Sequence, residues 1–501
     1  MPQNAFNLAA HALRHAGTQA DKPALMILGH DSVESWSYAR LAAAIGGIGT
    51  GLLYRGLNPG DRILLRLGNS AAFPLAFLGA IAAGLVPVPT AAALTAPEVT
   101  RAVALISPRL VIAGLGIALP DLSARTLTEA DLLAMTSLPP CEVAMGDPNR
   151  PAYIVFTSGT SGRSLPVLHA HRALLARAMM HQGWEGLGPS DRLLHAGAMN
   201  WTFTLGTGLL DPWTVGATAL VPAPGTAPAE LARLAARHGA TILAGAPGIF
   251  RQMLKSPLPP LPALRHGLAA GEALPPALRA EWQVATGTDL HEALGMTECS
   301  TFLSGSPARP APPGTTGFAQ PGRRLAVLDD QGQPLPPGQP GILAVHRSDP
   351  GLMLGYLDAP EDTAARLQGD WFVTGDLVEE TSDEVSPGGA FRHLGRADDI
   401  LNPGGFRIAP QEVEAALALC PDLTEIAVTE VETAPGTRIL AAAFVGPADE
   451  ASLTAHAAAH LARYKQPRLW FRLDHLPRNA NMKLNRRALR AALQDRFDDP
   501  T

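Results

Sequence analysis

The sequence predicts an α/β protein with two domains of unequal size. Between residues 4 and 140, and again between 169 and 244, helical stretches alternate with short β-rich runs, which is typical of a largely parallel sheet covered by helices. Proline and glycine are dense between residues 304 and 341, where two β-type runs flank a turn-rich connection. We therefore expect a large N-terminal domain of helix-covered, mostly parallel sheets with a small β-subdomain, followed by a smaller α+β C-terminal domain.

The elements of the first half are predicted from apolar periodicity and β-type composition. Expected strands are 62–67, 85–88, 109–113, 153–156, 192–196, 217–221 and 241–244. Expected helices are 41–53, 73–83, 169–180 and 228–238, the last with a proline suited to its first turn.

The second half contains a hairpin and a separate C-terminal unit. Runs 325–328 and 342–345 indicate the hairpin, and a polar, glycine-containing break follows at 381–390. The expected C-terminal elements are helix 410–418, strands 425–428 and 439–445, helix 451–463 and strand 469–473. We place the domain boundary just before Asp398, giving domains 1–397 and 398–501, the second of an ordinary domain size.

The composition excludes several functional classes. The chain has 501 residues, 47% of them hydrophobic and 17% charged, enough apolar material for a large core. The net charge is −6 and no lysine- or arginine-rich run occurs, so nucleic acid is not an expected partner. The three cysteines lie far apart, which suits a reducing compartment. With no basic and apolar leader at the N-terminus, and with Pro74 and Gly79 breaking the apolar run 71–88, we expect a cytoplasmic protein without a membrane span.

A loop of small residues follows the expected strand 153–156. Residues 157–162 read Thr-Ser-Gly-Thr-Ser-Gly, and hydroxyls together with glycine amides can wrap an oligophosphate. A Walker loop is excluded because no lysine follows Gly162, and a nucleophile elbow is excluded because Arg163 stands where its last glycine belongs. An ordinary turn is the alternative, but the motifs further along favour a phosphate loop.

A hydroxyl stands beside a carboxylate at the end of the segment 291–298. Thr297 can donate to an α-phosphate oxygen, and Glu298 can hold the Mg²⁺ that shields the phosphate charge. Further on, Thr-Gly-Asp at 374–376 ends a short β run, where the Asp376 carboxylate can accept both hydroxyls of a ribose. Each stretch alone has a plain structural explanation, a strand end and a turn respectively.

Two longer stretches complete the pattern. In residues 395–414, two arginines bracket a glycine-rich turn before the expected helix from Pro410, and residues 476–490 carry Lys483 in a basic segment. All of these stretches together resemble the motifs of the adenylate-forming superfamily, which includes acyl-CoA synthetases, adenylation domains and luciferases. The resemblance spans residues 4–490, and the match over residues 395–414 is its most specific part.

The resemblance implies a role for each matched residue. The catalytic residues would be Lys483, Thr297, Glu298 and Arg407, with Glu298 and Thr160 near the metal. ATP and AMP would be bound by Thr157, Ser158, Gly159, Thr160, Ser161, Gly162, Arg163, Gly271, Glu272, Glu292, Leu294, Gly295, Met296, Asp376 and Arg396. Asp398 would be the hinge of a mobile C-terminal domain, and Gly404 and Gly405 would line the tunnel for coenzyme A.

This chain departs from the family pattern at four positions, the first of which is Ser164 in place of a proline. Leu165 replaces the phosphate-loop lysine, Leu294 replaces an adenine-site tyrosine, and Met482 replaces a glycine before the catalytic lysine. We hypothesise that Arg163 takes over the charge of the missing lysine. An unchanged ATP dependence of adenylation in an Arg163→Ala variant would contradict this.

The expected activity is that of an AMP-forming ligase that uses ATP, Mg²⁺ and coenzyme A. The stretches 199–205, 244–247 and 268–272 resemble medium-chain and benzoate-type acyl-CoA synthetases, with Trp201, Phe203, Gly245, Ala246 and Ala270 as the acyl pocket. Core packing explains both aromatic residues equally well. No basic residue lies in these stretches, which disfavours dicarboxylic substrates. The alternatives are a stand-alone enzyme that loads a carrier protein and a catalytically impaired binding protein of the same fold; a homodimer is a further expectation.

Overall fold

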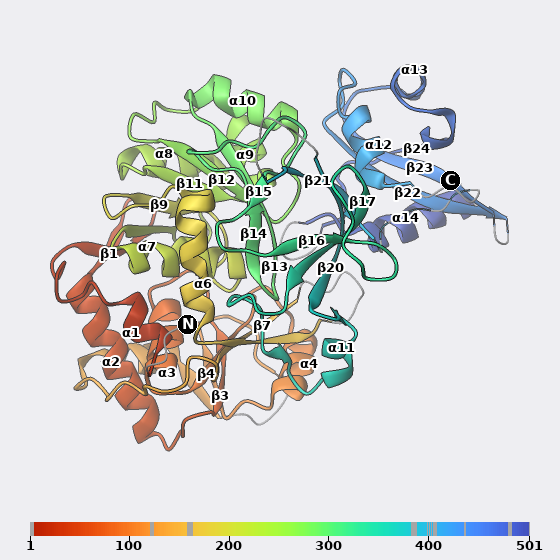
Figure 1. Cartoon of the computed structure of the whole chain (residues 1–501). Helices are drawn as coiled ribbons and strands as arrows, with labels where there is room; N and C mark the ends of the chain where they lie inside the picture. The colour runs from red at the N-terminus through yellow and green to blue at the C-terminus, as the bar shows by residue number, and fades with distance from the viewer. Residues whose placement is uncertain are drawn as a thin grey trace. The chain divides into compact units, whose positions relative to one another are not determined.

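Two separately packed units make up the chain in the computed structural model. It describes residues 5–120, 125–157, 164–381, 388–397, 399, 401, 403, 408–434, 437–478 and 483–499. Unit 1 comprises Met1–Arg324 and His346–Asp370, and unit 2 comprises Leu325–Val345 and Trp371–Thr501 (Figure 1). The boundary expected before Asp398 stays a prediction, because residue 398 lies outside the described residues.

A four-stranded parallel sheet forms the N-terminal part of unit 1. Its strands, in spatial order, are β4 (Val86–Pro89), β3 (Arg62–Arg66), β5 (Leu110–Ala113) and β6 (Thr126–Thr128). The helices of this region are α2 (Tyr38–Tyr54), α3 (Ala72–Ala82), α4 (Ala96–Ile106) and α5 (Glu129–Ala134). Helix α3 is buried along its whole length. It packs closely on α2 because Gly79 lacks a side chain, whose Cβ would lie 2.6 Å from Ile48 Cγ2.

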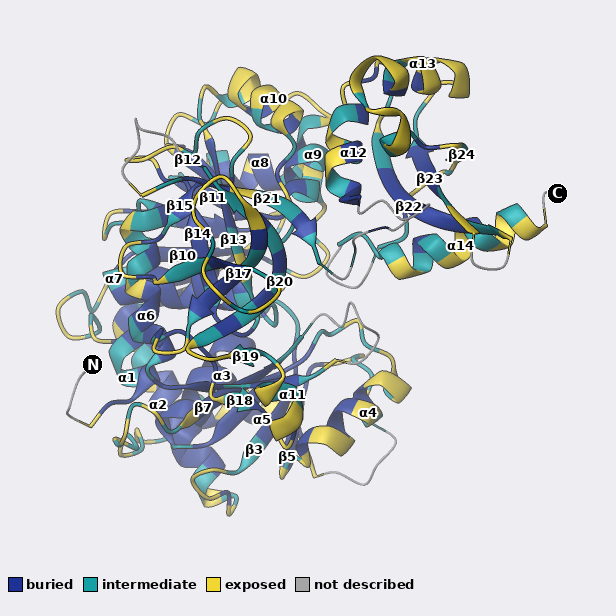
Figure 2. Cartoon of the chain, turned by 45° about the vertical axis from the view of Figure 1, so that its right-hand side comes forward, coloured by how far each residue is buried: buried dark blue, intermediate teal, exposed yellow. Residues whose placement is uncertain are grey.

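The centre of unit 1 is a nine-stranded sheet. Its strands, in spatial order, are β15 (Phe318–Ala319), β14 (Ser300–Ser304), β13 (Leu290–Met296), β12 (His266–Ala270), β11 (Ile242–Gly245), β9 (Arg192–His195), β10 (Thr218–Pro222), β1 (Pro23–Leu28) and β2 (Val33–Ser37). The run from β13 to β1 is parallel throughout. Strands β10, β11 and β12 are buried along their whole length (Figure 2), as expected of parallel strands covered on both faces.

Alternation along these strands separates two cores. One face carries Leu194 and Leu243, packed against helices α8 (Pro228–Arg237), α9 (Pro247–Leu254) and α10 (Pro276–Thr286). The other face carries Leu193 and Ala244, packed against Met180, Trp184 and Phe203. These last residues come from or adjoin α6 (Ala173–Met180) and the π-helices η2 (His181–Glu185) and η3 (Thr204–Leu210). The predicted mostly parallel, helix-covered architecture is confirmed.

The expected helix over 169–180 is wrong in its first part. Residues Pro166–Ala170 form strand β8, which pairs antiparallel with β7 (Pro151–Phe156), and β18 (Gly355–Tyr356) adds on the other side. The helix α6 begins only at Ala173. The backbone groups of β7 need a pairing partner, and the apolar run before His169 supplies it. The loop after β7 is therefore the connection of a hairpin.

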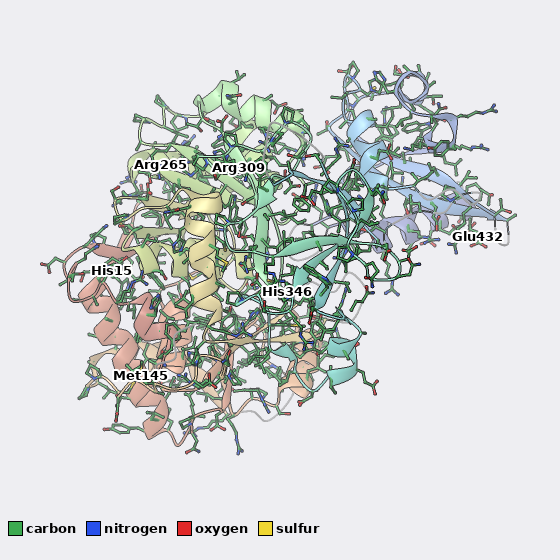
Figure 3. All side chains as sticks on the ribbon, in the orientation of Figure 1. His15, Met145, Arg265, Arg309, His346 and Glu432 are labelled. Carbon is green, nitrogen blue, oxygen red and sulfur yellow. The ribbon has the colours of Figure 1, made fainter. Side chains whose placement is uncertain are left out.

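An ion pair joins the amino ends of two central strands. Arg265, just before β12, lies 2.7 Å from Asp191, just before β9 (Figure 3 labels Arg265). The same carboxylate accepts a 2.7 Å hydrogen bond from the hydroxyl of Thr241, which precedes β11. Asp191 is buried, so these contacts offset the cost of its desolvation and tie three strands together.

Unit 2 contains two further sheets. The first includes the antiparallel pairs β16 (Leu325–Leu328) with β17 (Pro340–His346), which confirms the expected hairpin, and β20 (Trp371–Glu380) with β21 (Phe391–Arg396). The second is β22 (Glu425–Ala434), β23 (Thr437–Val445) and β24 (Leu469–Arg472), with α12 (Pro410–Leu417), α13 (Glu450–His460) and α14 (Arg486–Asp498). Side chains of all three helices pack on β22 and β23 or on their flanking loops.

Short elements complete the chain. They are α1 (Leu8–Ala12), η1 (Met135–Ser137), α7 (Asp211–Val215), α11 (Pro360–Ala364), β19 (Leu367–Gln368) and η5 (Arg463–Lys465). Within the described ranges, no helix is both long enough and apolar enough to cross a membrane.

Candidate active site

Predicted site residues of unit 1 gather at the carboxyl edge of the parallel strands. Gly245 and Ala246 end β11, and Ala270, Gly271 and Glu272 end β12 or follow it. The register places Gly245 beside Ala269 and Ala270 beside Ala293, so these ends lie next to one another and next to the end of β13. In open α/β sheets, ligands bind outside this edge. The structure therefore brings the predicted nucleotide and acyl residues of these three strands together.

The two predicted glutamates connect the loops at this edge. Glu292 Oε1 accepts a 3.0 Å hydrogen bond from the backbone N–H of Leu274, and Glu272 Oε1 accepts one of 3.2 Å from that of Gly248. The loop after β12 is thus tied to β13 on one side and to α9 on the other. Leu294, Gly295 and Met296 are partly or fully exposed at the end of β13, so their surfaces are available to a ligand.

The turn of Thr297 and Glu298 is held by three contacts from other segments. His169 Nε2–H donates to the Thr297 carbonyl at 2.8 Å, and the Tyr356 hydroxyl donates to Glu298 Oε1 at 2.7 Å. The backbone N–H of Met353 donates to the Glu298 carbonyl at 2.8 Å. Glu298 is buried. The carboxylate that the sequence assigns to Mg²⁺ is thereby fixed in direction.

Burial determines the protonation state of the two groups that support this turn. It lowers the pKa of His169 to about 4, so the ring is neutral at pH 7 and carries its one hydrogen on Nε2. Burial, and then the nearby Glu298 carboxylate, raises the pKa of Tyr356. The tyrosine is therefore a hydrogen-bond donor over the whole physiological range.

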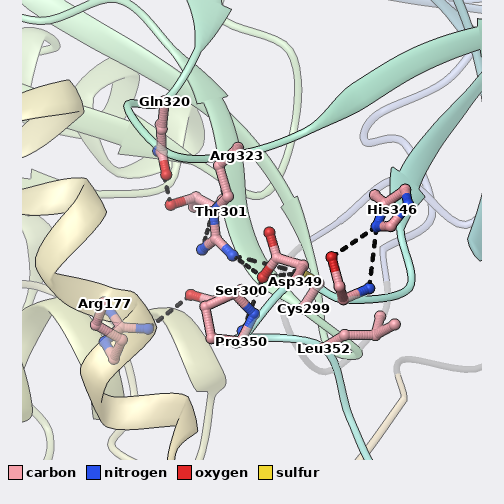
Figure 4. Close-up of polar contacts among 12 residues, drawn as sticks. Arg177, Cys299, Ser300, Thr301, Gln320, Arg323, His346, Asp349, Pro350 and Leu352 are labelled. Atoms are coloured by element: carbon pink, nitrogen blue, oxygen red, sulfur yellow. Dashed lines mark hydrogen bonds and ion pairs between the residues drawn. The ribbon is translucent and has the colours of Figure 1, made fainter. Parts of the chain in front are cut away.

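A buried ion pair contacts the residues that directly follow the turn (Figure 4). Arg323 pairs with Asp349, donates to the Thr301 carbonyl at 2.9 Å, and lies 3.8 Å from Cys299 Sγ. Asp349 also accepts a 2.7 Å hydrogen bond from the N–H of Gly351. These contacts join β14 to the segment that leads to Tyr356. The pair therefore fixes both partners of the Glu298 hydrogen bond.

Arg177 forms a second buried pair, with Asp211. Its Nε and Nη2 donate to the two carboxylate oxygens at 2.7 and 2.5 Å, and its Nη1 donates to Ser300 Oγ at 2.6 Å (Figure 4). Burial alone would raise the pKa of Asp211, but the Arg177 charge holds it below its ordinary value. Burial and the nearby Asp211 raise the pKa of Glu185 above its ordinary value. This cluster could not be predicted from the sequence because its members come from four separate segments.

The predicted acyl-pocket aromatic residues lie together. The rings of Trp201 and Phe203 meet edge to face with centroids 5.2 Å apart, and Trp184 lies 5.5 Å from Phe203. Phe203 and Ala270 belong to one buried cluster, against which the half-buried Trp201 packs. The cluster forms an apolar wall beside the carboxyl ends of β11, β12 and β13.

In unit 2, the structure joins two predicted nucleotide residues. Asp376 on β20 lies opposite Arg396 on β21, with Nη1 and Oδ1 3.5 Å apart, and His393 Nε2 lies 3.3 Å from the same oxygen. Burial alone would raise the pKa of Asp376, but His393 and Arg396 lower it below its ordinary value. The sequence placed Thr374–Asp376 at a strand end; instead β20 continues to Glu380, and Gly375 takes φ +80° within it.

Several predicted residues lie outside the described ranges. They are Ser158–Arg163 (including Thr160), Asp398, Gly404, Gly405 and Arg407. Thr157 is described: its backbone N–H donates to the Leu165 carbonyl at 3.0 Å, and its Oγ1 accepts from the Leu165 N–H at 2.9 Å. Lys483 is half-buried, and in the sequence it stands between strand β24 and helix α14.

The chain is similar to known proteins along most of its length. Residues 13–357 match the family model of the AMP-binding enzyme, and residues 412–483 match that of the AMP-binding enzyme C-terminal domain. The chain is 31% identical over 491 residues to the benzoate–CoA ligase of Thauera aromatica, covering 92% of each protein. It is 30% identical over 530 residues to the mitochondrial acyl-coenzyme A synthetase ACSM2B of Homo sapiens, covering 97% of this chain and 90% of that protein.

Solved structures extend the likeness to the fold. The anthranilate CoA ligase AuaEII, in complex with anthranoyl-AMP, matches with a TM-score of 0.87 at 26% identity, covering 98% of both chains. The family model of the larger domain alone covers more than half of the sequence. The chain therefore belongs to the AMP-binding enzyme family, which confirms the resemblance to adenylate-forming enzymes inferred from its motifs.

Proposed function

We propose that this protein is an AMP-forming acid–thiol ligase that activates a medium-chain or aromatic carboxylic acid. The acid attacks the α-phosphate of ATP, releasing pyrophosphate and forming an acyl-adenylate; the thiol of coenzyme A then attacks this anhydride and releases AMP. The observation that carries the proposal is the Thr297–Glu298 turn, held by His169 and Tyr356 at the sheet edge that also carries the apolar wall. The acyl-CoA synthetase and benzoate–CoA ligase relatives support coenzyme A as the acceptor.

The Glu298 site fits Mg²⁺. The ion prefers oxygen ligands and takes one or two carboxylates together with substrate phosphates. Glu298 uses Oε1 for the Tyr356 hydroxyl, and no described residue donates a hydrogen bond to Oε2. A bound Mg²⁺ would supply positive charge to the phosphates. The orientation of the carboxylate would come from the protein itself.

The remaining roles follow the family pattern. Thr297 donates to an α-phosphate oxygen, the loop 157–163 holds the outer phosphates, and Asp376 accepts the ribose hydroxyls. Lys483 and Arg407 neutralise the charge that gathers at the α-phosphate in the transition state. The lid bearing Lys483 turns about Asp398 after adenylation, and Gly404 and Gly405 then line the thiol tunnel.

The environment of Arg177 favours a monocarboxylic substrate. This arginine is buried, and both oxygens of Asp211 already engage its guanidinium. A second carboxylate on the substrate would be buried without a matching charge. The structure thus supplies a physical reason for a preference that the sequence alone predicted from the absence of basic residues.

A screen of AMP and pyrophosphate formation tests the proposal. Short-chain, medium-chain and aromatic acids are each supplied with ATP and Mg²⁺, with and without coenzyme A. Acyl-CoA formation supports the proposal. Acyl-adenylate formation that coenzyme A does not consume indicates a carrier-protein loader, and ATP binding without turnover of any acid indicates an impaired binding protein. A cytoplasmic location and a homodimer remain predictions.

The adenylation role of Lys483 is tested by Lys483→Ala. Removing one charged donor from a transition-state site costs about a hundredfold or more in rate, so acyl-adenylate formation should fall by that factor. Conversion of supplied acyl-adenylate to acyl-CoA should stay near the parental rate. Lys465→Ala is the matched control in the same unit, since Lys465 pairs with Glu412. Parental acyl-adenylate formation by Lys483→Ala would contradict the assignment.

A further inference from the structure

His195 is a fully buried histidine whose ring keeps one nitrogen without a partner. It is the last residue of β9, at the carboxyl edge, and it is 0% exposed. The backbone N–H of Gly197 donates to its Nδ1 at 3.0 Å, so Nδ1 carries no hydrogen. Burial, and then the charge of Arg177, lowers the pKa of His195 to about 3. The neutral ring therefore carries its hydrogen on Nε2, which has no acceptor among the described residues.

A buried N–H donor without an acceptor destabilises the fold and is uncommon in native proteins. A buried donor left without a partner costs about 1–3 kcal/mol, and native structures retain few of them. The buried histidines His169 and His266 show the usual solution, since their Nε2–H groups donate to the carbonyls of Thr297 and Glu185 at 2.8 and 2.7 Å. His195 differs from these two because its Nε2–H has no acceptor among the described residues.

The surroundings of His195 are those of the acyl wall. Its ring meets the Phe203 ring edge to face, with centroids 4.3 Å apart, and Phe203 in turn contacts Trp201. His195 projects from β9 to the same face as Leu193, which belongs to that buried cluster. An imidazole N–H is thus built into an otherwise apolar and aromatic wall.

A second polar group beside His195 also lacks a partner. The Thr204 hydroxyl is 0% exposed and no described residue hydrogen bonds to it. The hydroxyl oxygen and the Cε1 edge of His195 both face Gly197: a Cβ on that glycine would lie 2.2 Å from Thr204 Oγ1 and 3.1 Å from His195 Cε1. The same Cβ would lie 3.2 Å from His195 Nδ1, so the unpartnered Thr204 hydroxyl lies near the Nδ1–Cε1 edge of the His195 ring.

We propose that His195 is a specificity-determining residue whose Nε2–H donates a hydrogen bond to an uncharged oxygen on the acyl group, away from the carboxylate. The inference rests on the proposed function. The chemical class is an aromatic or aliphatic monocarboxylic acid that bears a hydroxyl or carbonyl oxygen. A neutral imidazole and a hydroxyl match such a substituent, whereas they supply no charge for a second carboxylate.

Pairs of acids that exchange a hydroxyl for a methyl group test this inference. The three hydroxybenzoates are compared with the three methylbenzoates, and 3-hydroxyoctanoate with 3-methyloctanoate, by kcat/KM for AMP formation in the full-length protein. A buried donor that loses its acceptor disfavours the methyl analogue. We expect the wild-type protein to prefer at least one hydroxy acid over its methyl partner by tenfold or more. In His195→Leu this ratio should fall to about one or below.

His266→Leu is the matched control. It removes a buried histidine from the same sheet, but from the amino end of β12 and with Nε2 already bonded to the Glu185 carbonyl. It should lower the melting temperature and leave the hydroxyl-to-methyl ratio within twofold of the wild type. His195→Leu should also lower the melting temperature, because it removes the acceptor of the Gly197 N–H.

Two results would overturn the inference while sparing the proposed function. In the first, the wild-type protein forms AMP, but kcat/KM for each hydroxy acid is less than twice that for its methyl partner. In the second, the wild-type protein prefers a hydroxy acid and His195→Leu keeps the same preference. Failure of every acid to yield AMP would instead contradict the proposed function, and the inference would fall with it.

Discussion

Single hydrogen bonds at the carboxyl edge determine how the reactive groups are aimed. The Tyr356 hydroxyl is the only donor to the Glu298 side chain among the described residues. Loss of a partner that orients a metal ligand typically costs 10–100-fold in metal affinity. We therefore expect Tyr356→Phe to raise the Mg²⁺ concentration needed for nucleotide binding by about tenfold, measured by calorimetric titration of ATP at several Mg²⁺ concentrations.

A second buried tyrosine is the control for this prediction. The Tyr38 hydroxyl donates to the Ala217 carbonyl at 2.6 Å, and its ring lies in the N-terminal region of unit 1. Tyr38→Phe should lower stability and leave the Mg²⁺ dependence unchanged. If Tyr356→Phe requires no more Mg²⁺ than the parent, the hydroxyl does not orient Glu298 toward the ion.

The sequence indicates candidate site residues more readily than the residues that hold them. Thr297, Glu298 and Asp376 lie in short motifs whose chemistry can be recognised locally. Tyr356, by contrast, reaches Glu298 from 58 residues away, and nothing in the sequence around it indicates that contact. Arg177 and His195 were missed for the same reason, because a lone polar residue in an apolar run has no recognisable partner until the fold is known.

At the scale of elements, the π-helix η3 depends on glycine for its contact with Arg177. A Cβ on Gly206 would lie 2.1 Å from Arg177 Cζ, inside the buried guanidinium. Gly206→Ala should therefore displace Arg177 from Asp211. Breaking a buried pair costs about 3–5 kcal/mol, and we expect a loss of that size in the free energy of unfolding, measured by urea denaturation.

Gly17→Ala is the matched control for this element. No heavy atom lies within 4 Å of the position of its Cβ, so its effect should stay within about 0.5 kcal/mol, as for most surface substitutions. Equal stability of the two variants would mean that η3 rearranges without disturbing the ion pair.

Most elements were predicted from the sequence, and the main error has a local cause. The expected helices 41–53 and 228–238 correspond to α2 and α8, and the expected strands 192–196 and 241–244 to β9 and β11. Residues 169 and 170 were wrongly placed in a helix because strand β8 is specified by its pairing with β7 and not by its own periodicity. Tertiary pairing decides such short apolar runs.

At the scale of the whole molecule, buried neutral histidines make stability depend on pH. Burial lowers the pKa of His169 and His291 to about 4 and of His171 and His195 to about 3. In the unfolded chain these rings titrate near 6.5, so between pH 6.5 and 4 the unfolded state binds more protons. Stability is therefore present above pH 6.5 and is lost as the pH falls.

We expect the free energy of unfolding to drop steeply between pH 7 and pH 5. Each such histidine contributes roughly 2 kcal/mol to the loss at pH 5. Glu185 has the opposite effect, because its raised pKa favours the folded state in acid. The contribution of this one carboxyl group is outweighed by that of the four histidines. Urea denaturation across this range checks the slope, which should be shallower in His195→Leu. A flat profile would show that these rings are protonated in the fold.

The two edges of the nine-stranded sheet divide their tasks. The Arg265–Asp191 pair secures the amino edge, while the groups assigned to acid recognition stand at the opposite ends of the same strands. A replacement at His195 or Trp201 removes no contact of the Arg265–Asp191 ion pair. Substitutions that change the preferred acid can therefore accumulate during evolution without loss of the contacts that hold the strands together.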